Sequence, residues 1–166
     1  PHTVIVYDEL EASEAVRWEW LLHSPTEFKM DVTKKTLSTN NKTKGWVAVT
    51  QLFGGHVFTL SQTDRFVVPP AITGAEYPNQ WHLTARVDGC SATRFLAIIQ
   101  VGDEAVPIIN RDGDTFNVGD WTIKAVLDAF KAPELAVSHR TEQAVFSYGT
   151  DNPALNGNFY SRQYTG

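Results

Sequence analysis

Residues 80–88, QWHLTARVD, alternate apolar and polar side chains, and this stretch decides the fold class. Trp81, Leu83, Ala85 and Val87 fall on one face of an extended chain, and the polar residues between them fall on the other. A strand of this kind buries one face in a core and turns the other toward water or a neighbouring element. The stretch therefore predicts a half-buried β-strand.

The same pattern continues in both directions along the chain, in short runs rich in Val, Ile, Thr and aromatic residues. It predicts an all-β protein, a two-layer antiparallel β-sandwich of about twelve short strands. The predicted strands are Thr3–Asp8, Ala15–His23, Glu27–Val32, Gly45–Leu52, His56–Gln62, Gln80–Asp88, Thr93–Val101, Ala105–Asn110, Asp114–Val118, Asp120–Leu127, Glu134–Ser138 and Gln143–Tyr148.

Residue pairs that contain glycine separate several of these runs. Gly54-Gly55, Asp88-Gly89 and Asp112-Gly113 are typical of hairpin turns, in which residues must tolerate a positive φ. Trp18, Trp20 and Leu22 share one face of their strand, which favours a place in the core.

Two segments depart from the strand pattern. Residues 34–44 are almost entirely polar, and we interpret them as an exposed loop or an edge hairpin. Lysines on such an edge commonly protect it from pairing with other chains, and they also bind carboxylates and sulfates. Residues 67–79 contain three prolines, which predicts a long connection between the sheets.

The length of 166 residues and the apolar fraction of 42% suit one compact unit. We expect a β-sandwich over residues 1–110 and a C-terminal β extension over residues 111–166 that packs on the same sandwich, or one single domain over 1–166. The chain has no initiator methionine, since Met30 is its sole methionine, and we expect it to be part of a longer protein.

Composition narrows the possible partners. A net charge of −5 argues against nucleic-acid binding through phosphate contacts, and no apolar run is long enough for a membrane helix. The lone cysteine, Cys90, has no internal disulfide partner.

Motif searches find little chemistry in the sequence. It lacks a glycine-rich phosphate loop, a Gly-x-Ser-x-Gly elbow and closely spaced histidine ligands, so we expect no metal or cofactor in this chain. Asp112-Gly113-Asp114 fits a turn better than a calcium loop. The five histidines are scattered, and each is explained most simply as a structural residue. His23 is the best exception, because it ends an apolar run where an ionisable group would face a cleft.

Exposed aromatic residues would suit sugar binding, whereas buried ones would fill the space between the sheets. Tyr160 and Tyr164 lie in a polar tail and fit either role. The candidate substrate-contact residues are His23, Lys34, Lys35, Lys42, Lys44, Tyr160 and Tyr164; the sequence supports no catalytic residue and no metal ligand.

Three stretches resemble the C-terminal β-sheet part of heparinase II/III-type polysaccharide lyases: residues 3–10 (TVIVYDEL), 18–24 (WEWLLHS) and 118–128 (VGDWTIKAVLD). In that family an (α/α) toroid precedes the sandwich, and an anionic, uronate-containing polysaccharide lies between them. The resemblance implies β-elimination, in which a base removes the proton beside the uronate carboxylate.

The family's catalytic residues, and its structural zinc where present, belong to stretches upstream of this sequence. The resemblance therefore implies a non-catalytic domain that supports the upstream catalytic domain of the same chain and contacts an anionic polysaccharide, in a periplasmic or secreted bacterial protein. The alternatives are an independent carbohydrate-binding module and a free-standing enzyme acting through His23 or His82.

Overall fold

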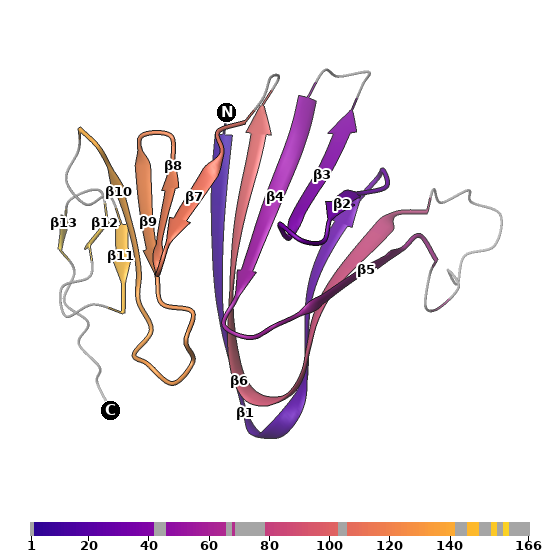
Figure 1. Cartoon of the computed structure of the whole chain (residues 1–166), viewed down its shortest axis with the longest axis horizontal. Coiled ribbons are helices and arrows are strands. Elements are labelled where there is room, and N and C mark those ends of the chain that lie inside the picture. Colours follow the sequence, from indigo (N-terminus) through magenta and orange to yellow (C-terminus); the bar gives the residue numbers. More distant parts are fainter. Residues whose placement is uncertain are drawn as a thin grey trace.

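The computed structural model describes residues 2–41, 46–65, 68, 79–102, 106–141, 146–149, 154–155 and 158–159. These residues contain no helix and form two antiparallel sheets, which confirms the all-β sandwich (Figure 1). The predicted connection over 67–79 lies almost wholly outside the described residues.

Residues 2–102 supply the first sheet, sheet A, and residues 109–159 supply the second, sheet B. Sheet A contains β1 (His2–Ser24), β2 (Lys29–Asp31), β3 (Thr36–Asn41), β4 (Trp46–Gly54), β5 (Thr59–Thr63) and β6 (Trp81–Gly102). Sheet B contains β7 (Ile109–Asp112), β8 (Thr115–Val118), β9 (Trp121–Ala125), β10 (Leu135–His139), β11 (Phe146–Tyr148), β12 (Ala154–Leu155) and β13 (Asn158–Phe159). The last strand of sheet A ends at Gly102, and the first strand of sheet B begins at Ile109.

Two strands are far longer than predicted. β1 runs for 23 residues and β6 for 22, and they pair antiparallel from His2↔Val101 to Ser24↔Trp81. The predicted strands Thr3–Asp8 and Ala15–His23 are thus two parts of β1, and Gln80–Asp88 and Thr93–Val101 are two parts of β6. The predicted hairpin at Asp88-Gly89 is wrong, because β6 continues through it. The register shifts twice between Glu11 and Trp18: residues 12–15 of β1 face only Ser91, and residues 88–89 of β6 face only Arg17. The surplus residues form bulges, and Gly89, with a φ of 74°, belongs to the one on β6.

These bulges let the β1–β6 ribbon fold back on itself (Figure 1). We call residues 2–11 of β1 with 92–102 of β6 and β4 the central arm, and residues 16–24 of β1 with 81–90 of β6 and β5 the outer arm. Leu52, Phe95 and Ala97 of the central arm pack against Ala85 and Val87 of the outer arm. Trp18 and Trp20 pack against the same core, and Leu22 packs beside it, which confirms the predicted core face.

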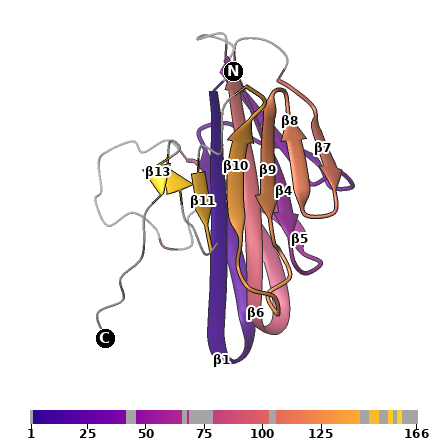
Figure 2. The same ribbon diagram turned by 90° about the vertical axis from the view of Figure 1, so that its left-hand side faces the viewer.

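Sheet B covers the opposite face of the central arm (Figure 2). Leu96 and Ile98 of β6 pack against Phe116, Ile123 and Val137 of sheet B. The central arm is therefore the middle of three layers, and residues 93–98 of β6 are all buried. Such a strand loses the polar–apolar alternation that a half-buried strand keeps.

Arg94 is the charged member of this buried run, with 5% of its surface exposed. Its guanidinium donates to the carbonyls of Val126 (3.2 Å), Asp128 (2.7 Å) and Lys131 (2.8 Å), and Glu9 lies 3.6 Å away. A buried charge is tolerated only when it is paired and hydrogen-bonded in this way. Arg94 thus fixes the 126–131 loop of sheet B to the central arm.

Glycine has a different role at Gly55 from the one predicted. Gly54-Gly55 connects β4 to β5 but makes no hairpin, because both strands pair with β6. A Cβ atom at Gly55 would lie 2.1 Å from the carbonyl oxygen of Leu127, so close backbone approach requires glycine. Asp112-Gly113 does form the predicted hairpin turn, between β7 and β8, with a φ of 57° at Gly113.

Residues 36–41 of the polar segment form β3, which pairs with β2 in a hairpin at the edge of sheet A. Leu37 is completely buried and packs against Phe28 and Leu83, which explains how so polar a strand joins the core.

The side chain of Gln62 joins β5 to the opposite edge of the folded sheet. Its amide accepts from the backbone N–H of Phe28 (3.1 Å) and donates to the carbonyl of the same residue (3.0 Å). One side chain therefore replaces a backbone ladder pair and closes the seam between the outer arm and the β2–β3 hairpin.

Substituting Gln62→Ala should lower the free energy of unfolding by about 2 kcal/mol, because it leaves both backbone groups of Phe28 without partners. Urea denaturation measures the loss. The matched control is Gln51→Ala, which removes one exposed hydrogen bond of 3.4 Å and should cost less than about 0.5 kcal/mol. Equal losses in the two variants would contradict the role of Gln62.

The hydroxyl of Tyr7 joins the layers by donating to the carbonyl of Val126 at 2.7 Å. Burial is the main cause that raises the pKa of Tyr7 above its ordinary value. The unfolded chain therefore releases this proton first, and the stabilisation present below about pH 10 falls as the pH rises further. Tyr7→Phe should cost about 1 kcal/mol at neutral pH and should flatten the alkaline fall in a stability–pH profile. An alkaline slope equal to that of the unsubstituted chain would contradict this.

Candidate functional site

His23 lies in a strand segment in which every second residue faces the core. Trp20 and Leu22 point inward and are partly buried, whereas His23 points outward from the outer arm and is exposed. Packing between the arms therefore explains its neighbours but does not require a histidine at this position.

His23 lies directly opposite His82 in the β1–β6 ladder. The two imidazole rings stack, with centroids 4.5 Å apart and planes 26° from parallel. Thr63 of β5 pairs with His82 on its other side, so a row of His23, His82 and Thr63 crosses three strands. Residues paired across antiparallel strands share one face of the sheet, which places all three on the outer face of the outer arm.

Two further rows continue this face toward the bend. The next is Leu21, Thr84 and Ser61, and the following one is Glu19, Arg86 and Thr59. We call these three rows together the histidine face. Leu21 is 55% exposed, so the face combines imidazoles, hydroxyls and charges with an uncovered apolar side chain.

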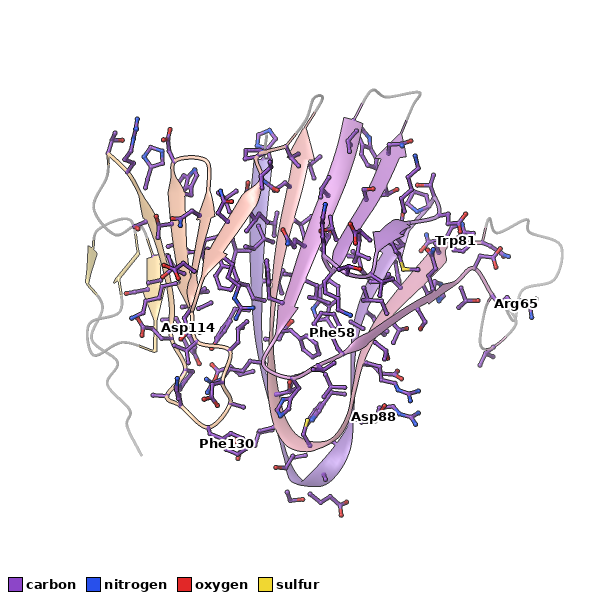
Figure 3. The ribbon with its side chains drawn as sticks, viewed as in Figure 1. Phe58, Arg65, Trp81, Asp88, Asp114 and Phe130 are labelled. Atoms are coloured by element: carbon purple, nitrogen blue, oxygen red, sulfur yellow. The ribbon has the colours of Figure 1, made fainter. Side chains whose placement is uncertain are left out.

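Asp88 pairs with two guanidinium groups at the end of this face that lies nearest the bend of the ribbon. Figure 3 shows Asp88 on the outside of the outer arm. It accepts from Nε of Arg17 at 3.1 Å and from Nε of Arg86 at 2.9 Å. The hydrogen bond from Arg17 is the main cause that lowers the pKa of Asp88 below its ordinary value. Both ion pairs are exposed to water, so they bring the two guanidiniums close together without fixing them rigidly.

The two described candidate lysines lie away from this face, in the turn between β2 and β3. Lys34 is exposed and lies 3.8 Å from Asp31. Lys35 has a φ of 53°, and its Nζ donates to the carbonyl of Phe58 at 3.0 Å and lies 4.9 Å from that residue's ring centre. Lys35 thus reinforces the seam that Gln62 closes. Lys42, Lys44, Tyr160 and Tyr164 lie outside the described residues.

The structure brings together His23 and His82, which the sequence analysis considered separately, and adds Thr63, Thr84 and Arg86 to the same face. The alternation within residues 80–88 already placed His82, Thr84 and Arg86 on one polar face. No signal in the sequence gave the register that pairs this face with His23, because that register follows bulges whose size the sequence does not specify.

The chemistry of the histidine face is hydrogen bonding to polar and anionic groups. Guanidinium groups bind carboxylates and sulfates, and imidazoles and hydroxyls bind hydroxyl-rich ligands. Within the described ranges, no group of three or more His, Cys, Asp or Glu side chains is arranged to hold a metal ion. The part of the chain that the structure describes also has no helix that could cross a membrane.

No family model matches this chain, and no curated protein matches its sequence.

Proposed function

We propose that this chain is the C-terminal β-sandwich domain of a heparinase II/III-like polysaccharide lyase, in which it supports the catalytic domain and contacts the anionic glycan. The reaction of the whole protein would be β-elimination of a uronate-containing polysaccharide in the periplasm or outside the cell. The catalytic residues, and a structural zinc if one is present, would lie upstream.

The observation that carries the proposal is the exposed position of His23, within a segment whose neighbouring positions are occupied by core residues. Sandwich packing accounts for Trp18, Trp20 and Leu22 of the resembling segment. His23 is the exposed member of this segment, and beside its stacking on His82 it offers an aromatic, ionisable side chain for a surface contact.

The three resembling segments also form one unit in space, which supports a shared structural origin. Trp20 of the second segment donates through Nε1 to Asp8 of the first at 3.0 Å. Tyr7 of the first segment donates to Val126 of the third at 2.7 Å. These contacts join the outer arm, the central arm and sheet B.

The histidine face would act by donating hydrogen bonds to a carboxylate or sulfate of the glycan, or to the surface of the catalytic domain. Arg17 and Arg86 both pair with Asp88, so their guanidinium groups lie close together and would donate to the same anionic group. The overall charge of −5 would repel a polyanion, so a local group of donors is needed for such contact.

The test compares the chain alone with the chain joined to its native upstream sequence, on heparin, heparan sulfate, chondroitin sulfate and alginate. Ultraviolet absorbance of the unsaturated uronate product reports the reaction. We expect turnover only in the joined protein. Turnover by the chain alone would contradict the proposal. If neither protein turned over any glycan but the chain alone bound one, the result would favour an independent carbohydrate-binding module.

In the joined protein, His23→Ala should lower kcat/KM roughly tenfold, because a hydrogen bond to a charged group is lost. The melting temperature should change little, since His23 is exposed. Asn110→Ala, at an exposed position of β7 in the other sheet, is the control and should keep full activity. If His23→Ala lowered kcat/KM and also lowered the melting temperature, the result would indicate a purely structural role for His23.

A further inference from the structure

The two sheets part at the end of the sandwich where β1 begins, and they leave a cavity of about 330 Å³ between them. We call it the mouth. Its described lining consists of His2, Thr3 and Ile5 from sheet A and Val118, Trp121, Ile123 and Val137 from sheet B. A cavity of this size, mostly apolar and with a few polar groups, is typical of a small-ligand site.

Trp121 forms part of the wall of the mouth and is 39% exposed. It begins β9 and pairs directly with His139 of β10. The two rings meet edge to face, with centroids 4.7 Å apart and planes at 61°. Nδ1 of His139 lies 3.0 Å from the hydroxyl of Thr141. The mouth therefore has a partly uncovered aromatic surface that packs on a neighbouring imidazole.

Thr3 supplies a hydroxyl to the mouth. It pairs with Gln100 across the β1–β6 ladder, so both side chains lie on the face of the central arm that looks toward sheet B. Gln100 itself is 1% exposed and does not belong to the described lining, although its Nε2 has no hydrogen-bond partner in the structure. Thr3 is therefore the residue of this pair that can contact a ligand in the mouth.

The lining selects the class of ligand. The polar groups of the described lining come from His2, Thr3 and the indole of Trp121, and the remaining lining residues are aliphatic. A pyranose ring fits the combination that is present, because its C–H face packs on an aromatic ring and its hydroxyls bond to uncharged donors and acceptors. We propose that the mouth binds one pyranose ring of a glycan, with the ring on Trp121 and a hydroxyl on Thr3.

This inference does not rest on the proposed function, because it concerns a different surface and requires no catalytic partner. The experiment titrates the 166-residue chain with methyl β-glucopyranoside and with methyl β-glucuronide, and follows saturation-transfer NMR signals of the sugar. We expect saturable binding of both, with dissociation constants on the order of millimolar. The strongest signals should come from the C–H protons of one ring face.

Trp121→Ala should weaken binding by roughly fivefold or more, whereas Trp121→Phe should restore part of it. The matched control is Phe130→Ala. Phe130 is also an exposed aromatic residue, at 89%, but it lies on the 126–131 loop near the bend of the ribbon, away from the N-terminus (Figure 3). This variant should bind as the unsubstituted chain does. Thr3→Val, a change at an exposed position, gives a second test that leaves the core intact.

The proposal is overturned if neither sugar binds, if cyclohexanol binds as well as the sugars, or if Trp121→Ala and Thr3→Val both bind at full strength.

Discussion

The continuous pairing of β1 with β6 is the constraint on which the rest of the structure depends. Each strand is more than 20 residues long, and a flat ribbon of that length would leave both faces largely exposed to water. The bulges between Glu11 and Trp18 allow it to fold, so one half of the ribbon covers the other and sheet B covers what remains. Residues 93–98 in the middle of the central arm are thereby buried on both faces, and the outer arm keeps one face free.

That arrangement determines where this protein has surface for function. Residues 93–98 of the central arm offer no such surface, since they are enclosed and Arg94 is engaged in fixing the 126–131 loop. The free face of the outer arm carries His23 and His82, and the open end of the sandwich carries the mouth beside Trp121. We therefore assign glycan or domain contact to the first surface and recognition of a single sugar ring to the second.

The sequence predicted the fold class because half-buried strands alternate, as residues 80–88 do. It also predicted the core face of Trp18 and the turn at Gly113. It did not predict the long ribbon, since Asp88-Gly89 has the same local chemistry in a bulge as in a hairpin turn. The site was only partly predictable: His23 was singled out from its position after an apolar run, but its stacking on His82 depends on a register set by those bulges.

Hydrogen exchange of the β6 amides tests the central claim most directly, because the amides in the middle layer should open only when the whole protein unfolds. We predict that residues 93–98 are the most protected of the chain, with an exchange free energy equal to that of global unfolding. The strands β9 and β10 of sheet B should be less protected. Faster exchange at 93–98 than in these strands would contradict an account in which the folded β1–β6 ribbon is the element on which both other layers depend.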